Sequence, residues 1–138
     1  MIKAILAKEF QKSNFFIKEN NMEYNADNVF AKIIRGEIPC QKIYEDEYAL
    51  SFYDIHPKAK VHALVISKGM FVDYNDFVNH SDDTEIAGFS RAVLKVAEIL
   101  GVAQSGYRIV FNTGKDSGQE VPHLHAHILG GEPLSTDL

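Results

Sequence analysis

Residues 123–127 read His-Leu-His-Ala-His and place three histidines at alternate positions within five residues. In a β-strand, successive side chains point to opposite faces of the sheet, so a strand over residues 121–129 puts all three imidazoles on one face. Leu124, Ala126 and Ile128 then share the other face, where they can pack on a core. Because a strand that gathers three ionisable rings gives up packing on that face, the pattern predicts a functional site.

Two chemistries fit this cluster of histidines. Neutral imidazole is a good zinc ligand, and three histidines resemble an open catalytic metal site. The side chains of His123 and His127 start roughly 13 Å apart at ~3.3 Å per residue, so two histidines with a distant residue fit an ion more easily than all three. Alternatively, one imidazole acts as a nucleophile without a metal, since imidazole with an ordinary pKa of ~6.5 is mostly neutral at pH 7.

The loop before the histidines favours a phosphate ligand. Residues 112–119 read Asn-Thr-Gly-Lys-Asp-Ser-Gly-Gln, a composition that lets backbone N–H groups converge on an anion. No glycine stands five residues before Gly114, so this is not a Walker A loop. Because the loop leads directly into three histidines, we expect a phosphate site beside them.

Short apolar patterns on both sides of a long helix indicate an α+β fold. Asn28 is a good N-cap for a short helix, and apolar residues at helical spacing predict a second helix over residues 83–100. Five β-like runs complete the pattern, at residues 42–45, 49–53, 62–67, 107–112 and 121–129. Strands clustered in this way favour an antiparallel five-stranded sheet with two helices over a doubly wound parallel sheet.

Length and composition limit the class of protein. With 138 residues, of which 46% are hydrophobic and 24% charged, the chain is long enough for one globular domain. The net charge of −5 disfavours binding to a nucleic-acid duplex but leaves small nucleotides open. The longest apolar runs are far shorter than the ~20 residues of a membrane span. Cys40 is the only cysteine and no stretch resembles a secretory signal, so we expect a cytoplasmic protein.

The first 27 residues differ in composition from the rest of the chain. They contain four lysines and a polar, asparagine-rich stretch at residues 20–25. We therefore expect residues 1–27 to form a loosely ordered N-terminal extension and residues 28–138 to form the domain.

Four ordered blocks of sequence resemble the histidine triad superfamily, in its branch of purine-nucleotide-binding phosphoramidases. Residues 118–131 are similar to the superfamily's signature, in which three alternate histidines are followed by two apolar residues. Residues 29–39 resemble the opening helix of that branch, and residues 52–55 and 62–66 resemble its next two blocks. The resemblance implies a homodimer whose sheet continues across the interface, with no metal or other cofactor.

The resemblance also implies a purine nucleotide, similar to AMP, as substrate and a role for each histidine. Such proteins hydrolyse the bond between a nucleoside monophosphate and an amine or similar leaving group. His125 would be the nucleophile, forming a nucleotidyl-histidine intermediate that water then cleaves. His127 would donate a hydrogen bond to a phosphate oxygen, and His123 and His62 would form a supporting proton network.

The same resemblance implies which residues hold the substrate. Asn112 and the backbone of Gly118, Gln119 and Glu120 would hold the phosphate, and Asp54 would accept hydrogen bonds from the ribose hydroxyls. Six apolar residues would line the base pocket: Val29, Phe30, Ile33, Ile38, Phe52 and Ile55. Glu120 departs from the family's pattern, because some relatives carry a serine there. Its carboxylate would repel a phosphate unless the side chain points away.

Two other classes of function remain open from the sequence. A metal-dependent hydrolase would use His123, His125 or His127 together with Asp54 or Glu120. A non-catalytic nucleotide sensor or scaffold would bind nucleotide tightly without a covalent intermediate. A dinucleoside polyphosphate hydrolase or a nucleotidylyltransferase of the same superfamily is less favoured, since the short chain leaves little room for their additional elements.

Overall fold

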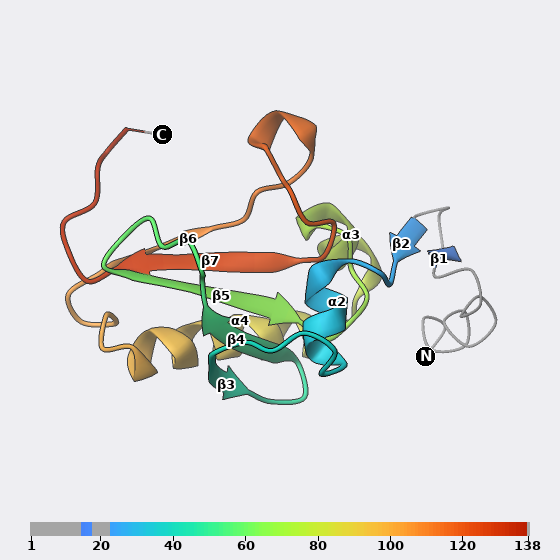
Figure 1. Ribbon diagram of the computed structural model, residues 1–138, viewed down its shortest axis with the longest axis horizontal. Coiled ribbons are helices and arrows are strands. Elements are labelled where there is room, and N and C mark those ends of the chain that lie inside the picture. The colour runs from blue at the N-terminus through green and yellow to red at the C-terminus, as the bar shows by residue number, and fades with distance from the viewer. Residues whose placement is uncertain (1–14, 18–22, 138) are drawn as a thin grey trace.

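The structure, a computed structural model, describes residues 15–17 and 23–137 and has an antiparallel five-stranded sheet at its centre (Figure 1). The order across the sheet is β3-β4-β5-β7-β6, and every neighbouring pair is antiparallel. The strands are β3 (Lys42–Glu45), β4 (Ala49–Tyr53), β5 (Val61–Ser67), β6 (Tyr107–Val110) and β7 (His125–Gly130). The predicted α+β fold is confirmed.

Two of the helices begin where the sequence predicts. They are α2 (Val29–Ile34) and α4 (Asp83–Ile99). Asn28 and Asp82 are the N-caps, and each side chain accepts a hydrogen bond from the backbone N–H three residues further along the chain, at 2.9 and 2.8 Å. Because a cap satisfies one of the four unpaired N–H groups of a helix start, these residues fix where each helix begins.

A third helix, α3 (Tyr74–His80), is present in addition to the two that the sequence predicts, so the expectation of two helices is wrong. It spans seven residues, which is too short for an apolar stripe of helical period to stand out in the sequence. Polar contacts hold it instead. Asp73 caps it by accepting from the N–H of Asp76, and the buried carboxylate of Asp76 accepts from the N–H of Val72 at 2.8 Å and pairs with His80.

The last strand begins at His125, four residues later than predicted. Pro122 has no N–H to contribute to a ladder. The N–H of Leu124 donates to the carbonyl of Phe71 at 2.7 Å, outside the sheet, while its own carbonyl accepts from the N–H of Ser67 at 3.1 Å. His123 therefore lies just before β7 and is held by contacts other than the strand ladder.

The two faces of the sheet carry different apolar clusters. One face packs against α4 in the large apolar cluster, whose members from the strands are Ala49, Ala63, Val65, Ala126 and Ile128. We call this the core face. The other face carries a smaller cluster with α2, made of Phe30, Leu50, Phe52, Leu64 and Ile66. We call this the histidine face, because Leu64 pairs with His127 and Ile66 with His125 in the β5–β7 register.

Most of the predicted N-terminal extension, residues 1–14 and 18–22, lies outside the described residues, as does residue 138. Two short strands, β1 (Phe15–Ile17) and β2 (Glu23–Asn25), pair with each other apart from the main sheet. Tyr24 in β2 is only 1% exposed and packs beside Ala31 of α2. The boundary at residue 27 stays a prediction, but before that residue the chain already contributes the buried side chain of Tyr24 to the domain.

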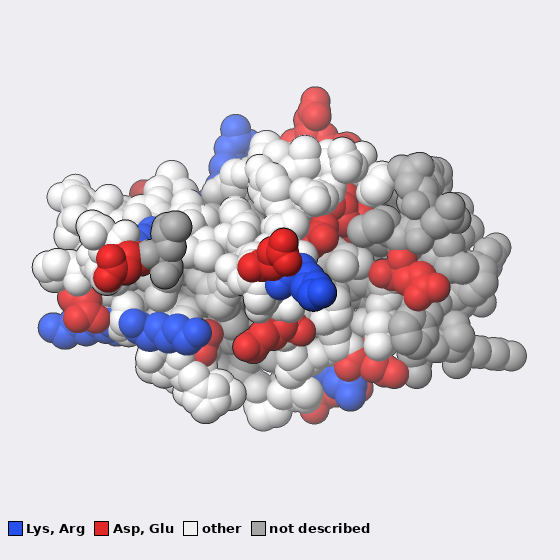
Figure 2. All heavy atoms as spheres, turned by 90° about the horizontal axis from the view of Figure 1, so that it is seen from above, with Lys and Arg blue, Asp and Glu red and all other residues white. Residues whose placement is uncertain are grey.

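Acidic and basic side chains are mixed on the surface. On the face shown in Figure 2, Lys and Arg side chains stand singly or beside Asp and Glu. Arg35 forms an ion pair with Glu37, and Glu45 lies between Lys42 and Lys68, at 2.6 Å from each ammonium nitrogen. Across the part of the chain that the structure describes, no helix is long and apolar enough to cross a membrane.

Candidate active site

Four histidines gather on the histidine face, at β5 and β7 and just before β7. His62 stands at the start of β5, and His125 and His127 alternate along β7. The ring centroids of His62 and His127 lie 5.2 Å apart, as do those of His125 and His127. The sequence prediction that the three neighbouring histidines share one face agrees with this placement, and β5 adds His62.

Hydrogen bonds assign the tautomer of His125. Its Nδ1 lies 2.7 Å from the carbonyl oxygen of His123, which can only accept, so Nδ1 carries the proton. In a neutral ring, Nε2 then holds the lone pair. His125 is 8% exposed, and burial lowers the pKa of its imidazole, which keeps the ring neutral. The arrangement presents an unprotonated ring nitrogen, as a nucleophile requires.

A second chain of hydrogen bonds assigns the tautomers of His62 and His127. The N–H of Lys58 donates to Nδ1 of His62 at 3.0 Å, so the proton of neutral His62 is on Nε2. That Nε2 lies 2.9 Å from Nδ1 of His127 and donates to it. The proton of neutral His127 is therefore on its own Nε2, which makes this nitrogen a hydrogen-bond donor.

Burial keeps this pair of rings neutral. It lowers the pKa of His62, with the carboxylate of Asp54 opposing the shift. Burial, together with the neighbouring imidazoles of His125 and His62, lowers the pKa of His127 to about 4. At neutral pH these rings are therefore uncharged, with defined donors and acceptors.

Asp54 lies beside this pair, directly after β4. One carboxylate oxygen, Oδ1, accepts from the N–H of His56 at 2.8 Å, and the other, Oδ2, lies 3.4 Å from Nε2 of His62. Its side chain is 18% exposed, so the carboxylate is accessible from solvent while it is held in place. The sequence placed Asp54 in the same site as the histidines, and the structure brings them together.

His123 is held at both ring nitrogens. Nε2 lies 2.6 Å from the carbonyl oxygen of Ser67, and Nδ1 lies 2.5 Å from the hydroxyl of Tyr24. The ring is only 1% exposed. The sequence predicts no role for Tyr24, because it falls in the predicted extension. The sequence feature that could have indicated a role for Tyr24 is its position as a lone aromatic residue in a polar stretch, four residues before the helix cap Asn28.

The six residues predicted to line a base pocket differ in burial. Phe30 and Phe52 are buried, with ring centroids 5.9 Å apart, and the ring of Phe30 lies edge-on to His125 at 4.9 Å. Ile33 and Ile38 are partly buried, whereas Val29 is exposed and Ile55 is 86% exposed. An isoleucine left so open is not a core residue, and it offers apolar surface to a ligand.

The loop predicted to hold phosphate is folded on itself. It contains a 3₁₀ turn, η3 (Lys115–Ser117). Two of the three predicted backbone donors already donate within the loop, Gly118 to the carbonyl of Lys115 and Gln119 to that of Gly114. The side chain of Gln119 is also engaged: it accepts from the N–H of Gly114 and donates to the carbonyls of Val72 and Val121.

Glu120 and Asn112 complete the predicted phosphate contacts. Glu120 is exposed, so its carboxylate can remain in solvent. Asn112 is partly buried and lies two residues after Val110, which pairs with His127 in the β6–β7 register. Asn112 thus follows the strand that borders β7.

Asp54, His62 and His127 form the group of possible metal ligands found among the described residues, with their ligand atoms within 4.8 Å of one another. The hydrogen bonds of His62 do not fit a metal ion at this position. An ion bound at Nε2 of His62 would move the ring proton to Nδ1, where it would face the N–H of Lys58. Two donors would then point at each other, so this set does not fit a metal held by neutral imidazoles.

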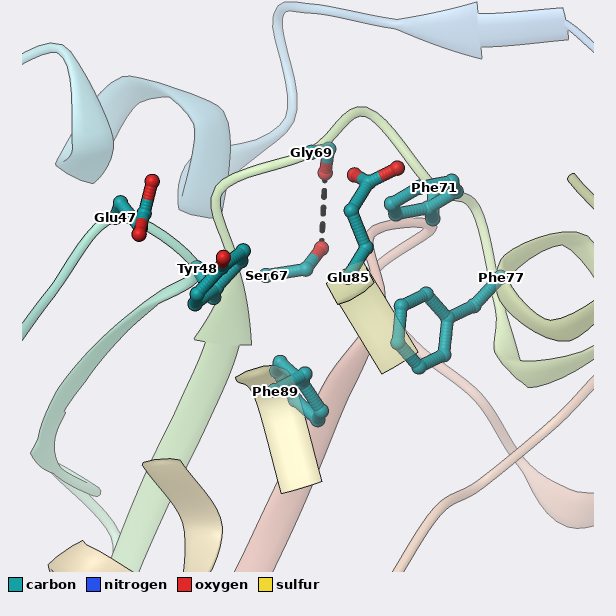
Figure 3. Close-up of a pocket in the computed structure, with 8 residues that line it drawn as sticks. All are labelled: Glu47, Tyr48, Ser67, Gly69, Phe71, Phe77, Glu85 and Phe89. Atoms are coloured by element: carbon teal, nitrogen blue, oxygen red, sulfur yellow. Dashed lines mark hydrogen bonds between the residues drawn. The ribbon is translucent and has the colours of Figure 1, made fainter. Parts of the chain in front are cut away.

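A small cavity of about 30 Å³ lies between α4, α3 and the end of β5 (Figure 3). Its lining includes Ser67, Phe71 and Phe89, and none of the four histidines. Figure 3 shows the hydroxyl of Ser67 donating to the carbonyl of Gly69, at 2.9 Å. The cavity is the size of one water molecule, so it is a packing feature next to Ser67 and not a substrate site.

The fold and the site define a class of protein, an antiparallel α+β domain with an ordered cluster of neutral histidines on one face of its sheet. The family model described as the HIT domain matches residues 35–134. The chain belongs to this family, the histidine triad superfamily.

Relatives with similar sequences and structures agree with this assignment. An uncharacterised HIT-like protein of Azospirillum brasilense is 54% identical over 111 residues, which cover 80% of this chain and 91% of that protein. The purine nucleoside phosphoramidase of Escherichia coli is 40% identical over 108 residues, covering 78% and 90%. A solved HIT family hydrolase of Legionella pneumophila is 40% identical, covers 80% of this chain and 97% of that one, and has a TM-score of 0.74.

Proposed function

We propose that this protein is a nucleotide hydrolase of the purine nucleoside phosphoramidase type, with His125 as its nucleophile. The observation that carries the proposal is the hydrogen bond from Nδ1–H of His125 to the carbonyl of His123, which leaves Nε2 of a buried, neutral ring with its lone pair. The similarity to a purine nucleoside phosphoramidase supports the reaction class.

The proposed reaction has two steps that balance. In the first, Nε2 of His125 attacks the phosphorus of a nucleoside phosphoramidate; the P–N bond breaks, and the amine leaves with the bonding electron pair and takes up one proton. In the second, water attacks the phosphorus, the bond from phosphorus to Nε2 breaks, and one proton is released. The products are a nucleoside monophosphate and the amine.

Other residues of the site fit the substrate groups. Nε2–H of His127 is a donor for a phosphate oxygen, since its other nitrogen already accepts from His62. The carboxylate of Asp54 is a suitable acceptor for ribose hydroxyls. The apolar surface of Phe30, Phe52 and the exposed Ile55 suits a purine base.

The metal-dependent alternative makes a different demand on His62. It requires the proton of the His62 ring on Nδ1, where this proton would face the backbone N–H of Lys58, which is also a donor. We therefore expect turnover to survive dialysis against a chelator. Loss of activity on chelation and its return with stoichiometric zinc would favour the metal mechanism.

Mass spectrometry of the intact protein tests the nucleophile. The protein is mixed with an adenosine phosphoramidate and quenched within milliseconds, in acid and in base, because histidine adducts of phosphorus are acid-labile. We expect an added nucleoside monophosphate in the wild type and none in His125→Ala, which should still bind the product monophosphate. Binding without any adduct or turnover in the wild type would show a non-catalytic nucleotide-binding protein.

We also propose that the protein forms a homodimer in the cytoplasm. β6 is an edge strand, and Ile109 on it is 45% exposed. Leu94 and Ile99 of α4 are about half exposed as well. An open strand edge is suited to pairing with a second copy of the strand, and exposed apolar side chains are suited to burial between two copies. Sedimentation equilibrium measures the mass in solution, and a monomer at micromolar concentration would contradict the dimer.

A further inference from the structure

We propose that Tyr24 is a positioning residue for the nucleophile: its hydroxyl donates to Nδ1 of His123 and so holds the backbone carbonyl that orients His125. The inference rests on the proposed function for its kinetic consequence. It assigns a role to the segment before α2, which lies outside the residues that the HIT domain model matches.

The direction of the hydrogen bond follows from the other ring nitrogen. Nε2 of His123 lies 2.6 Å from the carbonyl oxygen of Ser67, and a carbonyl can only accept. The proton of the neutral ring is therefore on Nε2. Nδ1 is left as an acceptor, and the hydroxyl of Tyr24, 2.5 Å away, is its donor.

Asn28 sets the orientation of the tyrosine hydroxyl. Its side-chain N–H group donates to the hydroxyl oxygen of Tyr24 at 3.1 Å and to the carbonyl of Asn25 at 2.8 Å. Its carbonyl oxygen is occupied as the cap of α2, accepting from the N–H of Ala31 at 2.9 Å. Since Asn28 meets the tyrosine oxygen as a donor, the tyrosine proton is directed to His123.

Burial keeps Tyr24 in its donor form. It raises the pKa of the phenol to about 12, so the hydroxyl stays protonated across the working range of pH. Its ring lies 5.6 Å from that of His123, and both side chains are 1% exposed. A donor lost from such a place is not replaced by bulk water.

His123 lies before the first residue of β7, and the N–H of Leu124 in its peptide group donates to the carbonyl of Phe71 outside the sheet. The strand ladder therefore does not fix its carbonyl, which is the group that accepts from Nδ1–H of His125. The ring is anchored at one side by Ser67, whose hydroxyl is itself bound to Gly69 as Figure 3 shows, and at the other by Tyr24. The two hydrogen bonds restrict the position of the His123 ring and of its backbone carbonyl. That carbonyl in turn orients the ring of His125.

The test compares Tyr24→Phe with Tyr44→Phe. Both remove one tyrosine hydroxyl that is hydrogen-bonded to a side chain; that of Tyr44 bonds Asp46 at 2.9 Å, on the edge strand β3. The two readouts are the ¹⁵N chemical shifts of the histidine ring nitrogens and the steady-state kinetics with an adenosine phosphoramidate. In the wild type we expect His123 to show a protonated Nε2 and an unprotonated, hydrogen-bonded Nδ1.

In Tyr24→Phe we expect the ring nitrogens of His123 to change and kcat to fall about 10-fold with KM nearly unchanged, because the substrate groups keep their partners. Tyr44→Phe should leave both readouts as in the wild type. Unchanged ring nitrogens, or unchanged kcat, in Tyr24→Phe would overturn the inference even if that variant melts at a lower temperature.

The wild-type spectrum alone also tests the hydrogen bond, should Tyr24→Phe not fold. A His123 ring with its proton on Nδ1, or with protons on both nitrogens, overturns the inference. If the wild type shows neither turnover nor an adduct, the proposed function has failed, and the ring-nitrogen shifts still confirm or overturn the bond on which this inference stands.

Discussion

The two faces of the sheet are made by the same strands but follow different rules. On the core face, residues such as Val65 and Ala126 are fully buried among apolar side chains of α4. On the histidine face, one residue further along each strand, buried imidazoles take part in directed hydrogen bonds. The core face stabilises the fold through close packing. The histidine face instead fixes, through hydrogen bonds, which ring nitrogen of each histidine carries the proton.

The largest expected effect separates the two faces. His125→Ala should lower kcat by more than about 10³-fold, because it removes the attacking nitrogen. Phe89→Ala, on α4 in the core face, should lower the free energy of unfolding by about 3–5 kcal/mol through the lost burial and the cavity left behind. Urea denaturation measures the second effect, and kcat per folded molecule measures the first.

Each variant is the control for the other. His125→Ala should remain folded, and Phe89→Ala should retain wild-type kcat for the fraction that is folded. If Phe89→Ala lost kcat in proportion to His125→Ala while still folded, the two faces would not be separable in function.

A smaller effect concerns pH. In the folded protein the pKa of His127 is about 4, against ~6.5 in an unfolded chain. Between these values the unfolded chain binds more protons, so the free energy of unfolding should fall as the pH drops from about 6.5 towards 4 and should be insensitive to this group above pH 7. Urea midpoints at pH 7, 6, 5 and 4 measure the slope.

His127→Gln isolates this contribution. The variant should show a shallower loss of stability over the same pH range, with part of the slope remaining because burial also lowers the pKa of His125 and His62. Equal slopes for wild type and variant would mean that His127 titrates normally in the folded protein.

The parts of the molecule that the sequence predicted are those with local causes. The cap Asn28, the helix over residues 83–100, the alternation around His125 and the strands at residues 42–45 and 49–53, which form a hairpin, are each decided within a few residues. In that hairpin, Asp46 accepts from the N–H groups of Tyr48 and Ala49, a typical turn contact.

The parts that the sequence did not predict depend on distant partners. Tyr24 meets His123 across 99 residues of chain, and no local pattern encodes that contact. The late start of β7 depends on Phe71, which takes the N–H of Leu124. The loop before the histidines has a composition typical of an anion site, yet Gln119 ties it to Val72 instead. Its inward hydrogen bonds could not be inferred from residue types alone.

The smallest expected effect compares the two helix caps. Asn28→Ala and Asp82→Ala each remove the side-chain acceptor that caps a helix, and the lost cap alone should lower the free energy of unfolding by about 1 kcal/mol. Of the two, Asn28 also donates to the hydroxyl of Tyr24. We therefore expect kcat to fall in Asn28→Ala and to stay unchanged in Asp82→Ala, measured with the same phosphoramidate.

Each variant loses one helix cap, and only Asn28→Ala also loses side-chain hydrogen bonds to Tyr24 and Asn25. α4 packs on the core face, so a weaker cap there should lower the free energy of unfolding and leave kcat unchanged. α2 packs on the histidine face, so a weaker cap there should reach His125 through Tyr24 and His123. Equal kcat values in the two variants would mean that α2 supports the site by packing alone, through the contact of Phe30 with the His125 ring.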